Sequence, residues 1–219
     1  MSNHRFGARH CTVGLLALLA LVLALAGCMS IPEPVSGGNT SMVIGQLKLE
    51  VSGVGSAPNG SYGVINAVLN SGSVLTLASV TGGKKFELKT TTADGMFTMP
   101  NAEPGEYILV KLRHRIRTSN AFIDIESDYT DGPEIDVSER HIVDMGIIHW
   151  SFRYDLVAGT SSNTVTFEDS NPAVLSAFAQ LYPKSAWLRY ETSPAGISGQ
   201  KAAAPDPSVD ANTRPPDNN

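Results

Sequence analysis

The strongest constraint on the fold is a series of short segments, spread over residues 42–152, in which apolar and polar residues alternate. In residues 42–51, the first of these segments, an apolar residue stands at every second position from Leu47 onward. A period of two is typical of a β-strand that buries one face. Further segments occupy residues 62–69, 74–80, 86–92, 121–126 and 140–152, with a shorter candidate at 164–167. The pattern predicts a mainly β chain, and its length favours one folded domain.

Turn-forming residues separate these segments. Asp94-Gly95 lies between two β-prone runs and predicts a hairpin. Pro104-Gly105 predicts a type II turn, because Pro fixes φ at the second position of the turn and Gly supplies a positive φ at the third. Residues 107–112 follow and are largely apolar on both faces, which predicts a central strand. Residues 53–61 also favour turns, and the strand order around residues 52–73 stays open.

The run from residue 90 to residue 112 resembles the prealbumin-like, carboxypeptidase-regulatory-like family of β-sandwich domains. Those domains carry a Thr-(Asp)-x-(Asp/Asn)-Gly-x-Phe hairpin, a short spacer, Pro-Gly-x-Tyr and an apolar strand. The matching residues are Thr92, Asp94, Gly95, Phe97, Pro104, Gly105 and Tyr107. The resemblance extends more loosely over about residues 42–150. It implies a Greek-key β-sandwich of about seven strands, used as a binding, spacer or stabilising module without a conserved catalytic set.

One short α-helix is predicted after the strands, at about residues 171–182. Asn171 can cap its start, and Pro172 is tolerated at the first helical position. Apolar residues then fall on one face of the helix, namely Val174, Leu175, Phe178 and Leu181. We expect this helix to cover an open end or a sheet edge, and partner binding is the alternative.

The remaining segments set the domain boundaries. Residues 186–190 are interpreted as a closing edge strand, so the folded domain spans residues 42–192. Residues 193–219 are rich in Pro, Ala, Asp and Asn without periodicity, which predicts a disordered tail. Residues 28–41 are rich in Pro, Ser and Gly and are predicted to form a flexible tether with a reach of roughly 20 Å.

The N-terminus has the three zones of a secretory signal, removed as residues 1–27. Arg5 and Arg9 precede an almost wholly apolar run at residues 13–25, and the small residues Ala26-Gly27 follow. The apolar run is shorter than the roughly 20 residues that a membrane-spanning helix needs. Cleavage is therefore expected, rather than retention as a membrane anchor.

Leu25-Ala26-Gly27-Cys28 resembles the lipobox of bacterial lipoproteins. The resemblance implies cleavage between Gly27 and Cys28, attachment of diacylglycerol to the Cys28 thiol, and acylation of the freed amine. Two or more acyl chains hold a protein on a membrane lastingly. In the best-studied diderm bacteria, Asp after the cysteine retains a lipoprotein at the inner membrane. Met29 stands here, which resembles outer-membrane sorting. An ordinary secretory signal with a chance cysteine is the alternative.

Charge and cysteine content exclude several classes of partner and site. The chain has 16 basic and 21 acidic residues, and only Arg5 and Arg9 leave with the signal. The mature chain, with 14 basic residues, is therefore near −7, which disfavours binding to nucleic acid. Cys28 is its only cysteine, because Cys11 lies in the signal. A disulfide or a thiolate metal site is excluded, and the fold depends on its core.

A search for catalytic patterns favours a protein that is not an enzyme. His114 lies among the arginines Arg113, Arg115 and Arg117, which disfavours a bound cation. His141 and His149 lie on one predicted strand, roughly 26 Å apart if it is straight. The sequence contains no nucleophile elbow, P-loop or dinucleotide fingerprint. No cofactor is expected.

Two kinds of ligand remain as alternatives. Residues 124–144 carry eight acids, and Asp128 and Asp131 are weak candidates for binding Ca²⁺. Pairing of these acids with the basic residues just upstream is the favoured interpretation. Aromatic side chains that glycan-binding sandwiches use are also present: Trp150, Trp187, Tyr129 and Tyr190. Tyr129 is the one expected to be exposed.

Together these patterns predict a lipoprotein anchored to the outer membrane through the lipid on Cys28. Its role is expected to be non-catalytic, as an interaction or structural module at the cell envelope with an envelope protein as partner. A glycan- or Ca²⁺-binding envelope lipoprotein is the second hypothesis, and an unrecognised envelope enzyme is the third.

Overall fold

The computed structural model describes residues 30–56, 62–117, 122–130, 132–155 and 160–197. The chain divides into two units, Met1–Ile31 and Pro32–Asn219, and every described helix and strand belongs to the second. Residues 1–29 with the predicted signal and Cys28, Asp131, and residues 198–219 lie outside the described residues. Within them the chain forms two β-sheets and one α-helix, so the prediction of a mainly β protein is confirmed.

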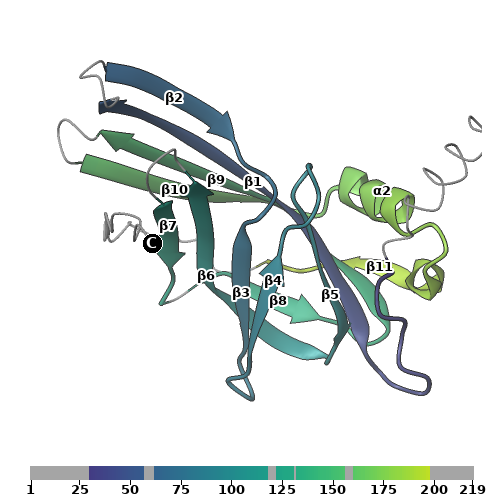
Figure 1. Ribbon diagram of the computed structural model, residues 1–219. Coiled ribbons are helices and arrows are strands. Elements are labelled where there is room, and N and C mark those ends of the chain that lie inside the picture. The colour runs from purple at the N-terminus through teal and green to yellow at the C-terminus, as the bar shows by residue number, and fades with distance from the viewer. Residues whose placement is uncertain (1–29, 57–61, 118–121, 131, 156–159, 198–219) are drawn as a thin grey trace, which may run out of the picture. The chain divides into compact units, whose positions relative to one another are not determined.

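The first sheet is built around two long parallel strands, β1 and β9 (Figure 1). The other edge of β1 pairs first with β5 and then with β2, and the other edge of β9 pairs with β11 and then with β10. The strands are β1 Ser41–Ser56, β2 Tyr62–Val68, β5 Met96–Ala102, β9 His141–Asp155, β10 Thr160–Glu168 and β11 Glu191–Pro194. Residues 53–56, predicted to favour turns, instead continue β1 because β2 and β9 pair with them.

The second sheet has the order β4–β3–β6–β7, with β8 beside the first part of β6. Its strands are β3 Val74–Ser79, β4 Lys85–Lys89, β6 Gly105–Arg117, β7 Phe122–Asp128 and β8 Glu134–Val137. The predicted central position of residues 107–112 is confirmed, because β6 has neighbours on both sides.

The main core lies between the two sheets. Leu49 and Trp150 from the first sheet pack in one buried cluster with Leu75, Leu109 and Ile125 from the second. In each sheet these side chains point to the face that is turned toward the other sheet, as the period-two alternation requires. The arrangement is consistent with a β-sandwich.

A second apolar layer lies on the opposite face of the first sheet. The helix α2 Pro172–Leu181 packs against β1, β5 and β9, and the 3₁₀ helix η1 Ala186–Arg189 follows it. The buried side chains of this layer include Met42, Ile44, Ile142, Val174, Phe178 and Trp187. The helix therefore covers a face of the sheet, and not the open end or edge that its sequence suggested.

The local signals for the helix are confirmed. The side chain of Asn171 accepts a hydrogen bond from Ala173 N, and Pro172 begins the helix. The predicted edge strand at residues 186–190 is wrong, because these residues form η1 and Tyr190. The edge strand is β11, which starts one residue later and pairs in parallel with the start of β9.

The predicted Asp94-Gly95 hairpin is also wrong. The strand before it, β4, belongs to the second sheet, and the strand after it, β5, belongs to the first. Asp94-Gly95 is thus a turn at which the chain crosses between sheets. Gly95 has φ +81°, and a Cβ there would collide with the carbonyl oxygen of Leu47, so the position requires glycine.

Pro104-Gly105 makes the next crossing, from β5 to β6. Gly105 has the positive φ that was expected, but its value of +138° is far from the roughly +80° of a type II turn. The hydroxyl of Tyr107 donates to the carbonyl oxygen of Glu103 at 2.8 Å and holds the bend.

The predicted start of the disordered tail at residue 193 is wrong for residues 193–197. Ser193 and Pro194 belong to β11. Ala195 is buried, its N–H donates to the carbonyl oxygen of Asp144, and its own carbonyl accepts from Asp136 N. Residues 193–197 are ordered because their backbone groups form hydrogen bonds with the sheet, a feature that side-chain periodicity does not reveal.

Candidate functional site

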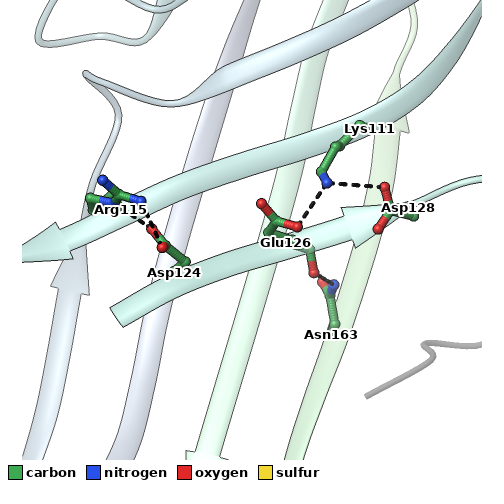
Figure 2. Close-up of polar contacts among 6 residues, drawn as sticks. All are labelled: Lys111, Arg115, Asp124, Glu126, Asp128 and Asn163. Carbon is green, nitrogen blue, oxygen red and sulfur yellow. Dashed lines mark hydrogen bonds and ion pairs between the residues drawn. The ribbon is translucent and has the colours of Figure 1, made fainter. Parts of the chain in front are cut away.

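The clearest polar surface lies on strands β6 and β7, whose outer faces carry opposite charges (Figure 2). The register places Lys111 opposite Asp128, Arg113 opposite Glu126 and Arg115 opposite Asp124. Lys111 Nζ lies 2.7 Å from Glu126 and 3.4 Å from Asp128. Arg115 donates to both oxygens of Asp124, at 2.6 and 2.8 Å. The expected pairing with upstream basic residues is confirmed for Asp124, Glu126 and Asp128, three of the eight acids.

This pairing determines the electrostatics of the surface. The Arg115 guanidinium lowers the pKa of Asp124 through its hydrogen bonds. The hydrogen bond to Glu126 raises the pKa of Lys111. Lys111 and Asp124 therefore both stay charged at neutral pH. Because the two signs alternate across the strands, the face has no large field of one sign that would attract an ion.

The Ca²⁺ candidates are not brought together by the described structure. Asp128 is engaged by Lys111, and Asp131 lies outside the described residues. Where side chains are placed, no three His, Cys, Asp or Glu side chains converge as metal ligands.

His114 is buried in β6 while its neighbours Arg113 and Arg115 are exposed. Its Nδ1 lies 2.9 Å from the hydroxyl oxygen of Ser73, and burial lowers its pKa. Ser73 has no exposed surface and also bonds with Thr90. A nucleophile must reach its substrate, so this serine–histidine contact is a satisfied polar pair of the interior. Ser73 was missed by sequence reasoning because only pairing between β3 and β6 brings it near His114.

His141 and His149 lie on β9 with separate partners. His149 Nε2 is 3.3 Å from Glu168 on β10, and His141 Nε2 is 3.9 Å from Glu191 on β11. His141 begins the strand and His149 lies near its middle, so the two histidines form no common site.

The aromatic residues do not form the exposed platform considered from the sequence. Trp150 and Trp187 are fully buried, and their indole N–H groups donate to Asn163 Oδ1 and to the carbonyl oxygen of Pro32. Tyr190 packs on Trp187 at 5.1 Å between ring centroids. The expectation that Tyr129 is exposed is wrong: its side chain packs against the main core, and burial raises its pKa to about 12.

Asp144 is a buried carboxylate that the sequence patterns did not single out. It is only 2% exposed, and its oxygens accept hydrogen bonds from Gly146 N at 2.7 Å and from the Ser170 hydroxyl at 3.2 Å. Burial raises its pKa in spite of these bonds. Because Gly146 marks an irregularity in β9 and Ser170 precedes α2, Asp144 ties the strand to the start of the helix.

The most informative site is the segment predicted to be a flexible tether. Asn101 Oδ1 accepts hydrogen bonds from Val35 N at 3.0 Å and from the Thr40 hydroxyl at 3.1 Å, and Asn101 Nδ2 donates to the carbonyl oxygen of Glu33 at 3.1 Å. Asn101 has φ +56°, a conformation that asparagine tolerates better than most residues.

The start of the same segment is held by η1. Glu33 Oε2 accepts a hydrogen bond from Ala186 N at 3.0 Å, and the Pro32 carbonyl accepts from Trp187 at 2.8 Å. We call residues 32–40 with these contacts the N-terminal clasp. The prediction of a flexible tether is therefore wrong for residues 32–40. Composition hid the contacts, because most of them use backbone atoms and all come from residues far along the chain.

Comparisons with known proteins add no relative. No protein-family model matches the chain, and neither a curated protein nor a solved structure matches it. Among the residues that the structure describes, none of the helices has the length and apolarity to span a membrane.

Proposed function

We propose that this protein is a lipoprotein of the cell envelope, anchored to the outer membrane through Cys28, whose β-sheet body is a non-catalytic interaction or structural module. The sequence Leu25-Ala26-Gly27-Cys28, directly after the apolar run of residues 13–25, carries the proposal. Cys28 is the only cysteine after the cleavage point, so lipidation would use the one thiol of the mature chain. Residues 1–29 lie outside the described part, so support comes from the sequence.

We also propose that the body is a Greek-key sandwich of the prealbumin-like type. The motif residues support this, because Phe97 and Tyr107 are buried in the main core and Gly95 and Gly105 both have positive φ. The crossings at Asp94-Gly95 and Pro104-Gly105 place successive strands in different sheets, which is compatible with the connections between the two sheets of such a sandwich.

A non-catalytic role is supported by the chemistry of the described side chains. The contact between Ser73 and His114 is closed to a substrate, and His141 and His149 pair with different carboxylates. The Ca²⁺ and glycan alternatives gain no supporting observation, since Asp128 is paired and the tryptophans are buried.

Labelling with a clickable fatty acid in a diderm host tests the anchor. The wild-type protein should incorporate the label and fractionate with outer membranes at high salt, because the attachment is covalent and apolar. The Cys28→Ala variant is the control and should lose both properties. Membrane retention of the unlabelled Cys28→Ala variant would show instead that residues 13–25 remain as an anchor.

Cross-linking of envelopes tests the interaction role. The lipidated protein should capture one specific envelope protein from intact cells, and the capture should depend on the folded body. The matched control is the Cys28→Ala variant, which retains the folded β-sheet body but lacks the lipid attachment. It distinguishes direct contact with a partner from co-localisation on the same membrane. If neither form captures a defined partner, the interaction role fails while the anchor remains.

A further inference from the structure

We call the folded part of the chain, residues 32–197, the body. The N-terminal clasp determines how many residues of chain remain free between the body and the proposed lipid on Cys28. The hydrogen bonds of Pro32, Glu33 and Val35 fix the chain from residue 32 onward. Three residues, 29–31, stand between Cys28 and Pro32. A chain of this length spans at most about 14 Å in any conformation. The body therefore cannot move away from a membrane to which Cys28 is attached.

The clasp lies at one end of the body. It leads directly into Ser41, the first residue of β1, and the 16 residues of that strand run to the opposite end. At about 3.3 Å a residue, β1 is roughly 50 Å long. In Figure 1 the segment before β1 and the far ends of β2 and β10 lie at opposite ends of the first sheet. The short free chain thus forbids the inverted orientation, although the body could still lie on its side.

Exposed apolar side chains distinguish an upright body from one on its side. Among the described residues, Val35 at 56% and Val80 at 50% are the large hydrophobic side chains left exposed. Val35 belongs to the clasp. Val80 lies in the β3–β4 turn, where its N–H donates to the carbonyl oxygen of Glu106. Figure 1 shows this turn and the segment before β1 at the same end of the body.

The charges at this end are mixed. Lys84 and Lys85 follow Val80, and the exposed Glu103 and Glu106 lie close to the Asn101 side of the clasp. Electrostatic attraction to anionic lipid therefore contributes little. The acyl chains and the apolar side chains would determine how the body is oriented on the membrane.

We infer that this end of the body, formed by the clasp and the β3–β4 turn, rests on the lipid surface. The inference depends on the proposed anchoring at Cys28. Val35 and Val80 contact the interfacial region of the bilayer, while the far ends of β1, β2, β9 and β10 point away from the membrane. The polar outer face of β10 is thereby presented to partners at a distance from the lipid.

Fluorescence quenching of the lipidated protein in vesicles tests the orientation. Because Cys28 is blocked by lipid, a cysteine introduced at Lys184 or at Ser162 is the sole thiol to label. Lys184 lies beside η1 near the clasp, and Ser162 is exposed near the far end of β10. A nitroxide quencher on the lipid headgroup should quench the label at position 184 severalfold more than the label at position 162, at low and high salt alike.

Two variants show what produces the contrast. A flexible Gly-Ser insertion of about 20 residues after Ile31 lengthens the free chain and should abolish the difference in quenching. The double variant Val35→Ser and Val80→Ser keeps the chain length and should reduce the difference. Thermal unfolding of each labelled protein checks that the body stays folded.

The outcomes separate the two proposals. Equal quenching at positions 184 and 162, in protein that floats with the vesicles, overturns the orientation and leaves the anchor intact. Protein that carries no lipid and does not float with vesicles overturns the anchor itself. A difference in quenching that survives the long insertion shows that surface contacts alone hold the orientation, and overturns the role of the short chain.

Discussion

The two halves of β1 differ in what covers them. Residues 41–47 are buried on both faces, whereas beyond Leu47 burial alternates, with Leu49 buried and Glu50 exposed. The C-terminal segment causes this difference in burial, because α2 and η1 cover only the part of the first sheet that contains Met42 and Ile44. One strand therefore serves as an interior strand at its start and as a half-exposed strand further on.

Replacing a buried side chain of the helix should give the largest effect. Phe178→Ala removes a ring that is fully buried between α2 and the first half of β1. We expect a loss of about 3–5 kcal/mol in the free energy of unfolding, measured by urea denaturation. Thr164→Ala, on the exposed face of β10 beside the second half of the sheet, is the control and should change it by less than about 0.5 kcal/mol. Similar losses from both would remove the distinction between the halves.

The irregularity in β9 should also be sensitive. Gly146 has φ +68°, and a Cβ there would collide with the carbonyl oxygen of Glu168. Gly146→Ala therefore combines backbone strain of about 1–2 kcal/mol with a displacement of β10. Gly83→Ala, at φ +64° in open space, carries the strain alone. Urea denaturation should show a greater loss in the free energy of unfolding for Gly146→Ala than for Gly83→Ala. Equal losses would mean that β10 moves away from the added Cβ at no cost.

The clasp should respond to removal of its central side chain. Asn101→Gly keeps the positive φ and removes three hydrogen bonds to residues 33–40. Each bond contributes about 0.5–1.5 kcal/mol, so residues 32–40 should exchange their amide hydrogens faster while β9 stays protected. Ser176→Ala, at an exposed position on α2, is the control. Unchanged exchange in the Asn101→Gly protein would show that η1 alone holds the segment.

Two carboxylates should contribute to the free energy of unfolding with opposite pH dependence. Burial raises the pKa of Asp144 in the folded protein, so its contribution to stability is complete at low pH and is lost as the pH rises through that pKa. Arg115 lowers the pKa of Asp124, so its contribution is present at neutral pH and is lost on acidification. Relative to Asp144→Asn, the wild type should lose stability from pH 3 to pH 7, and relative to Asp124→Asn it should gain. Slopes of the same sign would contradict this assignment.

Local patterns predicted the strands and the helix well. The alternation after Leu47, the cap at Asn171 and the pairing of opposite charges on β6 and β7 depend on neighbours in sequence or on adjacent strands. Asp94-Gly95 was misread because a turn that joins paired strands and a turn that crosses between sheets need the same residues. The clasp was missed for a different reason: Asn101 binds atoms of residues 61 to 68 positions away, which leaves no periodic signal.

The parallel pairing of β1 with β9 has a consequence for the order in which the chain folds. Ser41 and His141, joined by a hydrogen bond, are 100 residues apart. Contacts of such long range form slowly, because the intervening loop must first be closed at an entropic cost. A chain made from its N-terminus therefore keeps β1 without its central neighbour until β9 has emerged. The last strand of the second sheet ends at Val137, so we expect the first sheet to be completed after the second, although its first strand is made first.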